Sequence, residues 1–526
     1  MNRWQGEQHA AAQLSQNISH QIPQHDHNKD KDKDKNNKSF APVTSSEQQF
    51  QFQNECQINR LNSIEPTSRI QSEAGTTEWW NPNSQQLRCA GVSVFKYNVE
   101  PNGLVLPSFT NAPQLVYIVQ GRGIQGTVMP GCAETFQESQ QGQRQQRPGR
   151  FQDQHQKIRR FRKGDMIALP AGVVHWFYND GNERLVTVNL LHTANSDNQL
   201  DNNPRRFNLA GNPEEEQRRL RRFAQQQMQG SRSESEEMED EDEEEQDNRP
   251  SRRQSGSRHE QQSSSCNNLL CAFDQEFLAQ AFNVDTSLIR RLQEVRGQKG
   301  SIIRVRDRLD VVSPPTMEEE EREESRQEQR YRERRPYGRD NGLEETFCAM
   351  RLKENIADPE RADIVNPQAG RLCTLNRYNL PILNALGLSA ERGVLYNRAG
   401  TVPQWCINAH KILYMLEGRA RIQVVNENGD TVFDDNVEQG QLLTVPQNFA
   451  FMKRAGSEGA EWVSFFTNSE AANTPLAGQV SAIRAMPEEV VAASYQISRE
   501  DARKLKFNNE DTFFFTSSRS ERRDEA

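Results

Sequence analysis

The chain has 526 residues, of which 34% are hydrophobic, and its 65 basic and 74 acidic residues give a formal net charge of −9. This length provides for two or three domains. Because basic and acidic residues are interleaved in blocks, the charge argues against nucleic acid or an anionic membrane as a partner. Gln and Arg each account for about fifty residues, so the chain is rich in side-chain nitrogen.

Membrane spans and zinc sites are also disfavoured. No run of about 18 apolar residues is present, so no membrane-spanning helix is predicted, and the N-terminus lacks the apolar core of a secretory signal. The spacing of the cysteines does not fit the paired C-x-x-C and His patterns of zinc sites. We therefore expect some of them to form disulfides. The chain has eight cysteines: Cys56, Cys89, Cys132, Cys266, Cys271, Cys348, Cys373 and Cys406.

Polar tracts divide the chain. Residues 1–47 combine dense charge with no apolar periodicity, and we expect them to be disordered. Further tracts at about 134–160, 229–263 and 317–341 are Gln/Arg-rich or acidic and are expected to be exposed and mobile. Short apolar segments such as QLVYIVQG, MIALPAGVVHWFY and ILYMLEG lie between them, bounded by Gly, Pro and Asn. This pattern predicts a mainly β fold, either a sandwich or a barrel.

An internal repeat indicates two homologous domains. The segment 111–122 recurs at 408–419 with the same internal spacing, and Gly164 with Pro170 recurs as Gly440 with Pro446. A helical pattern starting at Glu276 matches another starting at Glu489. Each copy is therefore predicted to form a barrel followed by helices. The two copies lie near residues 60–300 and 354–508.

A pattern of glycine, proline and histidine in the first repeat carries a family resemblance. The pattern G-x5-P-x-G-x2-H-x3-N is met by Gly164, Pro170, Gly172, His175 and Asn179, and it is similar to the second motif of the cupin superfamily. The resemblance implies a bicupin: two jelly-roll β-barrel domains, each followed by a small helical arm, with long disordered insertions. In a cupin the histidine of this motif projects toward a metal.

The rest of the cupin ligand set is degenerate. Phe109 and Asn111 stand where the first motif has histidines, and Gln114 is nearest the position of its glutamate. In the second repeat, Lys411 stands near the glutamate position, Asn448 replaces the second-motif glycine and Phe451 replaces the histidine. One imidazole gives a transition metal neither charge balance nor enough ligands. We therefore expect no metal, no cofactor and no catalytic residue.

Two histidines have simpler interpretations. His175 is expected to lie at a barrel rim, satisfied by its neighbours. His410 follows Cys406 by four residues and could be taken for the base of a cysteine nucleophile, but no orienting third group can be assigned. We expect His410 to have a packing role.

The segment Asn341–Cys348, NGLEETFC, followed by Ala362 and Asp363, resembles the signature of the 11S, or legumin-type, seed storage globulins. The resemblance covers residues 47–510. It implies a nutrient reservoir of nitrogen, carbon and sulfur for germination, deposited in the protein storage vacuole through the endoplasmic reticulum.

The same resemblance implies a processing scheme. An asparaginyl endopeptidase cuts between Asn341 and Gly342, and disulfides join Cys56 to Cys89 within the first chain and Cys132 to Cys348 across the cut. The precursor forms trimers through the helical arms, and the processed protein forms hexamers. We expect a segment 1–47, a first cupin domain 48–300, a linker 301–341 and a second cupin domain 342–526.

Three other functions compete with this interpretation. A cupin oxidase or dioxygenase is disfavoured by the missing His/His/Glu set. A 7S vicilin is also a bicupin reserve but lacks the NGLEETFC motif. A non-catalytic module that binds a small ligand in one barrel stays open, because barrels accommodate such ligands readily.

Overall fold

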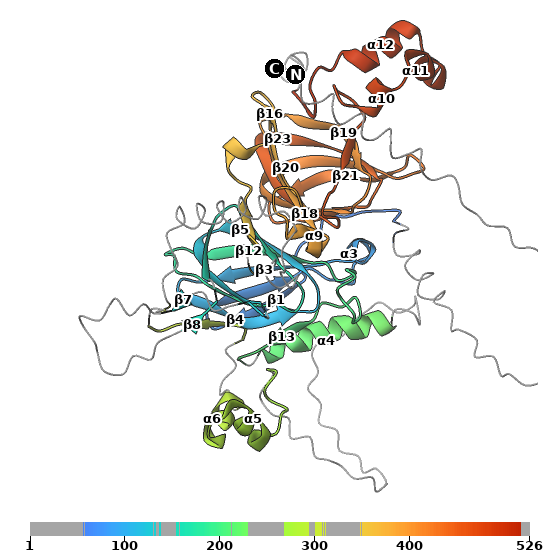
Figure 1. Cartoon of the computed structure of the whole chain (residues 1–526). Helices are drawn as coiled ribbons and strands as arrows, with labels where there is room; N and C mark the ends of the chain where they lie inside the picture. The colour runs from blue at the N-terminus through green and yellow to red at the C-terminus, as the bar shows by residue number, and fades with distance from the viewer. Residues whose placement is uncertain are drawn as a thin grey trace, which may run out of the picture. The chain divides into compact units, whose positions relative to one another are not determined.

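The computed structural model describes residues 56, 58–129, 131–132, 136–137, 154–156, 158–211, 213–229, 268–293, 300–307, 309, 311, 348 and 350–516 (Figure 1). The segment 1–47, the bond between Asn341 and Gly342, and most of the three polar tracts lie outside the described residues. No helix in the described part of the chain is long and apolar enough to cross a membrane.

The first barrel is built from two antiparallel sheets. A seven-stranded sheet has the order β1-β2-β3-β12-β5-β10-β15, and a six-stranded sheet has the order β13-β4-β11-β6-β9 with β14 paired to β4. Their bounds are β1 (Ser68–Ser72), β2 (Gly75–Trp79), β3 (Ser93–Val99), β4 (Gly103–Thr110), β5 (Gln114–Gln120), β6 (Arg122–Val128), β9 (Ile158–Arg162), β10 (Asp165–Leu169), β11 (Val174–Tyr178), β12 (Leu185–Leu191), β13 (Arg206–Asn208), β14 (Ile302–Arg304) and β15 (Lys353–Asn355).

Strands continue into the first polar tract. The pair β7 (Phe136–Gln137) and β8 (Gln154–His155) forms a separate two-stranded sheet, and β9 begins at Ile158, inside the segment expected to be mobile. Ile158 and Phe161 are buried in β9, and β9 pairs with β6, so the end of this tract extends the sheet.

The second barrel contains one ten-stranded antiparallel sheet. Long strands β20 and β23 pair with each other along most of their length, and both bend at register shifts. The bounds are β16 (Ile364–Asn366), β17 (Gly370–Leu375), β18 (Ser389–Leu395), β19 (Gly400–Cys406), β20 (Lys411–Val425), β21 (Thr431–Glu438), β22 (Leu442–Val445), β23 (Ala450–Phe466), β24 (Asn473–Pro475) and β25 (Phe514–Phe515). The bicupin fold expected from the sequence is confirmed.

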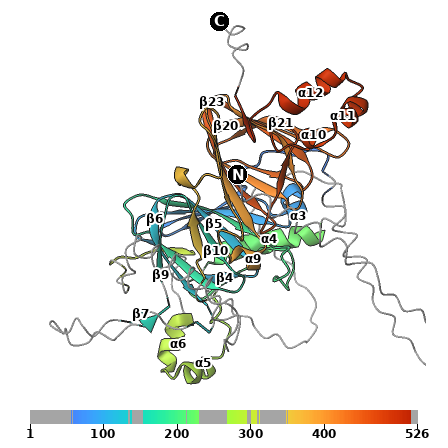
Figure 2. The same ribbon diagram turned by 45° about the horizontal axis from the view of Figure 1, so that its top comes forward.

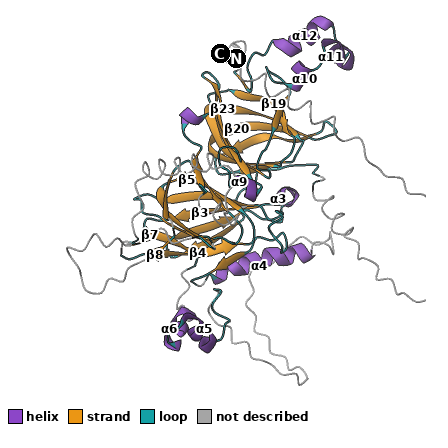
Figure 3. Cartoon of the chain, viewed as in Figure 1, coloured by secondary structure: helices purple, strands orange, loops and turns teal. Residues whose placement is uncertain are grey.

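Helices are few in the described part of the chain and lie outside the sheets (Figure 3). They are α3 (Gln85–Ala90), α4 (Glu214–Gln229), α5 (Gln275–Phe282), α6 (Thr286–Gln293), the 3-10 turn η2 (Pro359–Arg361), α9 (Leu383–Leu386), α10 (Ala482–Ala485), α11 (Glu488–Tyr495) and α12 (Arg499–Phe507). The helix α4 lies beside β13 (Figure 1), where Glu216 of α4 forms a buried ion pair of 3.3 Å with Arg206 of β13.

The turns show the internal repeat at atomic detail. Gly164 and Gly440 both adopt φ of +89°, and their N–H groups donate 2.9 Å hydrogen bonds to the carbonyls of Ile118 and Met415, which are equivalent strand positions. Such a positive φ favours glycine because it has no Cβ. The two barrels therefore share one turn geometry as well as one strand order.

The helical arms repeat in the same way. In the first, α5 ends at Asn283 with φ of 51° and leads into α6; in the second, α11 ends at Gln496 with φ of 54° and leads into α12. After each left-handed residue a backbone N–H donates 3.0 Å to a carbonyl five residues earlier, a common helix ending. The helices of each arm pack side by side (Figure 2).

Segments near the expected chain ends are exchanged between the barrels. Strand β15 belongs to the part of the chain after the expected cut, yet it pairs with β10 of the first barrel. Conversely, Leu61 donates to the carbonyl of Val432, and Ile64 forms a β-bridge with Leu442 of the second barrel. Strand β14, in the segment expected as a linker, pairs with β4.

An apolar core continues between the two barrels. The indole of Trp80 meets the ring of Tyr414 edge to face at 6.0 Å between centroids, and both rings are buried in a cluster that draws leucines and valines from both barrels. Because burying each large apolar side chain contributes about 1.5–3 kcal/mol, this shared core stabilises the contact between the two barrels non-covalently.

Candidate functional site

The residues of the second cupin motif have structural roles in the first barrel. Gly172 follows Pro170 in the turn before β11, with φ of +73°, and its N–H donates to the carbonyl of Thr110. The side chain of Asn179 is fully buried; its amide donates to the carbonyls of Val99 and Glu183, and its oxygen accepts from the N–H of Gly181. These contacts hold the turn that follows β11.

His175 lies on β11 with 5% of its surface exposed. Its Nδ1 is 3.1 Å from the carbonyl oxygen of Val173, and its ring meets the Phe177 ring edge to face at 5.9 Å. Burial lowers the pKa of His175 to about 4, because removal from water disfavours the charged imidazolium. The imidazole is therefore neutral at pH 7 and has a backbone partner.

The positions of the first cupin motif converge on protein partners. Phe109 stacks on Phe207 of β13 at 4.8 Å. Asn111 bonds to the loop at 198–205, and Gln114 donates a 3.0 Å hydrogen bond to Asn189. None of these side chains supplies an anionic ligand beside His175.

A buried ion triad lies at the corresponding place in the second barrel. Glu391 of β18 lies 2.5 Å from the Nζ of Lys411 and 3.9 Å from the Nζ of Lys453, and each of the three side chains is at most 1% exposed. The Glu391 carboxylate also accepts hydrogen bonds from Trp462 Nε1 and Ser464 Oγ. Lys411 could be singled out from the sequence, whereas its partners Glu391 and Lys453 could not.

Aromatic rings contact the two lysine amines of the triad. Lys411 Nζ lies 4.7 Å from the ring centroid of Phe451, the residue that replaces the motif histidine, and Lys453 Nζ lies 4.0 Å from the Trp462 ring. Such contacts favour a desolvated cation. Asn448, with φ of 66°, forms the turn that glycine forms in the first barrel.

The charges of the triad act on each other. Burial alone raises the pKa of Glu391, but Lys411 and Lys453 outweigh it and lower that pKa to about 2. Burial, and then the neighbouring Lys411, lower the pKa of Lys453 well below its usual value. A carboxylate held between two amines replaces the metal ligands of a cupin with an internal ion cluster.

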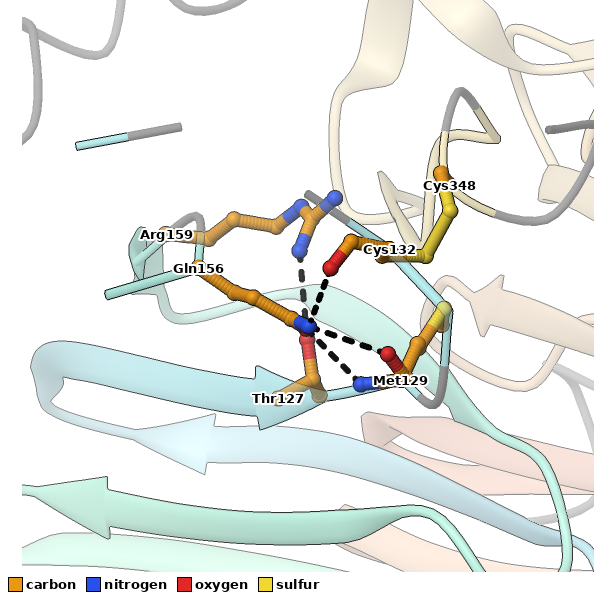
Figure 4. The surroundings of a disulfide bond; sticks show 6 residues. All are labelled: Thr127, Met129, Cys132, Gln156, Arg159 and Cys348. Atoms are coloured by element: carbon orange, nitrogen blue, oxygen red, sulfur yellow. Dashed lines mark hydrogen bonds between the residues drawn. A yellow bond between two sulfur atoms is a disulfide. The ribbon is translucent and has the colours of Figure 1, made fainter. Parts of the chain in front are cut away.

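The disulfide between Cys132 and Cys348 crosses the expected cut site (Figure 4). Gln156 supports it: its amide nitrogen donates to the carbonyls of Cys132 and Met129, and its oxygen accepts from the N–H of Met129. The bond spans 216 residues of sequence, so it ties a loop of the first barrel to the segment that leads into β15.

The second disulfide joins Cys56 to Cys89 of α3. Cys271 is also disulfide-bonded, Cys266 lies outside the described residues, and the free cysteines of the described part are Cys373 and Cys406, both buried. Burial raises the pKa of the Cys373 thiol to about 11 and also raises that of Cys406. Neither thiol is therefore a nucleophile at neutral pH.

His410 lies at the end of the loop that follows β19. Its ring Nδ1 accepts a 3.2 Å hydrogen bond from the backbone N–H of Gln447, whereas the Cys406 sulfur faces the side-chain oxygen of Asn408 at 3.9 Å. Burial lowers the pKa of His410. The sulfurs of Cys56 and Cys89 lie within 4.8 Å of one of its ring nitrogens, a grouping that the sequence spacing did not indicate.

Comparison with known proteins adds a family context. The Cupin family model matches residues 61–215 and 354–503. Legumin A of Gossypium hirsutum is 75% identical over 482 residues, covering 90% of this chain and 94% of the relative. The structure of procruciferin, an 11S globulin from Brassica napus, has a TM-score of 0.70 at 40% identity and covers 89% of this chain and 99% of that one.

A second similar structure bears on ligand binding. It is described as the 11S globulin from Wrightia tinctoria that reveals an auxin binding site; it has a TM-score of 0.69 at 38% identity and covers 88% of this chain and 96% of that one.

Proposed function

Since the chain belongs to the 11S seed storage globulins, a branch of the cupin superfamily, we propose that it serves as a nutrient reservoir of nitrogen, carbon and sulfur for germination. The observation that carries this proposal is the 75% identity to a legumin over nearly the whole chain. The many Gln and Arg residues suit a nitrogen store. The ion triad in one barrel and the satisfied His175 in the other support a non-catalytic role.

Processing is the second part of the proposal. An asparaginyl endopeptidase cuts the precursor between Asn341 and Gly342, which lie outside the described residues. Two features support survival of the fold after this cut: the disulfide between Cys132 and Cys348, and the exchange that places β15 in the first barrel. The two chains then stay together as one particle.

Assembly uses the helical arms. On α5, Phe277 and Phe282 are 68% and 56% exposed, and on the other arm Tyr495 and Leu505 are 56% and 51% exposed. Contiguous exposed apolar side chains of this kind mark interaction surfaces. The arms of neighbouring copies cover each other in a precursor trimer, and processed trimers pair into hexamers. Deposition takes place in the protein storage vacuole after passage through the endoplasmic reticulum.

The test compares the protein isolated from seed by mass spectrometry with and without reduction, with N-terminal sequencing of every chain. Two chains released by reduction, the second beginning at Gly342, support the scheme. An uncut chain with free thiols at Cys132 and Cys348 contradicts it. Sedimentation before and after treatment with an asparaginyl endopeptidase then distinguishes a trimer from a hexamer.

A second candidate function is the binding of a small ligand. It is supported by the auxin site named for the Wrightia tinctoria globulin, which is 38% identical to this chain. Isothermal titration of the purified hexamer with indole-3-acetic acid tests it, because saturable binding with one stoichiometry supports a ligand site and the absence of heat contradicts it.

A further inference from the structure

Three metal-ligating side chains from distant parts of the chain meet at one place. The sulfur atoms of Cys56 and Cys89 and one ring nitrogen of His410 all lie within 4.8 Å of one another. Cys89 belongs to α3, and His410 immediately precedes β20 of the second barrel. In the structure the two sulfurs are joined as a disulfide, a state in which sulfur is a poor metal ligand because the thiolate is the binding form.

The histidine is held in place independently of the sulfurs. Its backbone N–H donates 3.0 Å to Thr467 Oγ1, its carbonyl accepts 3.2 Å from the Thr467 N–H, and its Nδ1 accepts 3.2 Å from the Gln447 N–H. Because Nδ1 accepts this last hydrogen bond, the lone pair of the neutral ring lies on Nδ1 and the ring proton lies on Nε2. A metal bound at Nδ1 replaces this one hydrogen bond.

The distances fit a tetrahedral ion. Zinc binds thiolate sulfur at about 2.3 Å and imidazole nitrogen at about 2.0–2.1 Å, which places neighbouring ligand atoms about 3.5–3.8 Å apart. Three atoms already within 4.8 Å of one another reach that spacing by small side-chain rotations once the bond between the sulfurs is broken. A water molecule takes the fourth position.

We propose that reduction of the Cys56–Cys89 disulfide opens a binding site for a thiophilic divalent cation such as Zn²⁺, held by the two thiolates and the His410 imidazole. The soft sulfur ligands and the imidazole select zinc over the hard cations Mg²⁺ and Ca²⁺.

The chemistry balances with a dithiol as reductant. One of its thiolates attacks the half-buried Cys56 sulfur, the bond to Cys89 breaks, and the second thiol closes the reductant into its own disulfide. The dithiol thus supplies two electrons and two protons, and the protein gains two thiols. Binding of the metal then displaces both thiol protons into solvent.

The site has a consequence for the processed protein. Cys56 and Cys89 precede the bond between Asn341 and Gly342, and His410 follows it, so the metal links the two chains when reduction has opened the disulfide across the cut. This consequence rests on the proposed cleavage, whereas the metal site itself does not.

The experiment uses the full chain, reduced with dithiothreitol, desalted without oxygen and titrated with Co²⁺ and then Zn²⁺. A sulfur-to-cobalt charge-transfer band and one tightly bound ion per chain are expected. The matched control is the C132S/C348S variant, which lacks the disulfide between Cys132 and Cys348 and keeps the cluster, and it should bind as the wild type does. The oxidised wild type should bind none.

Two variants decide between the outcomes. C56S/C89S should lose the band and the tightly bound ion. H410N keeps the disulfide and therefore the covalent framework, and after reduction its affinity for zinc should fall on the order of 10- to 100-fold. The proposal is overturned if the reduced wild type takes up no metal, if C56S/C89S binds as the wild type does, or if H410N matches the wild-type affinity. None of these readouts depends on cleavage or storage.

Discussion

Removing the acid of the buried triad should destabilise the second barrel strongly. In a Glu391→Gln variant the amines of Lys411 and Lys453, at most 1% exposed, lose their counter-charge while remaining out of water. Loss of one partner from a buried ion cluster costs about 3–5 kcal/mol. For a domain of this size that corresponds to a drop in melting temperature on the order of 10 °C.

The assay is thermal unfolding of the purified full chain at pH 7, followed by circular dichroism, with E427Q as the control. Glu427 is exposed in a turn of the same barrel, so its substitution should change stability by less than about 0.5 kcal/mol. A melting temperature for E391Q within the scatter of E427Q would refute the claim that the triad depends on its carboxylate.

The pH dependence follows from the direction of the pKa shift. The pKa of Glu391 is lowered to about 2 in the folded state, so its stabilising effect is complete above the ordinary glutamate pKa and is lost as the pH falls through about 2. The difference in stability between wild type and E391Q should therefore shrink progressively between about pH 5 and pH 2. A difference that is constant over this range would show that the charge is not its source.

Three further predictions concern Lys453, the turn at Asn179 and the cut chain. Because the pKa of Lys453 is lowered in the folded state, the K453M variant should have a higher free energy of unfolding than the wild type at neutral pH. Denaturant titrations should show that this difference vanishes above about pH 10.5, where the lysine of the unfolded chain is also neutral. N179A removes three hydrogen-bond contacts from a fully buried turn and should lower the free energy of unfolding by about 2–4 kcal/mol; a loss below about 1 kcal/mol in urea titration would contradict the structural role of this motif residue. After cleavage at Asn341, the C132S/C348S variant should still elute from gel filtration as one particle, because β15 stays paired with β10 in the first barrel. Separate elution of the two chains would show that only the disulfide holds them together.

Much of the fold could be predicted because its signals are local. The Gly164 and Gly440 turns, with identical φ, follow from spacing that the sequence repeats, and alternating apolar residues mark the strands between them. The capped helix pairs α5–α6 and α11–α12 begin within one residue of the positions expected from the apolar pattern. The disulfide pairs were expected from family resemblance, and the structure joins the same cysteines.

The rest depends on contacts that sequence periodicity does not encode. Strand β15 pairs with a strand almost 190 residues earlier, and nothing in its three residues identifies that partner. Glu391 and Lys453 are charged residues on buried strand positions, and unlike Lys411 they do not stand at a cupin motif position, so no sequence pattern grouped the three. The approach of His410 to Cys56 and Cys89 joins three segments and becomes visible only when both barrels are in place.

The most direct test of the storage function is the amount of this chain in the seed over time. Quantitative mass spectrometry of its peptides should show accumulation in storage vacuoles during seed maturation, cleavage after Asn341 before desiccation, and depletion within the first stages of germination. A level that stays constant through germination, or a chain confined to tissues other than seed, would contradict the account.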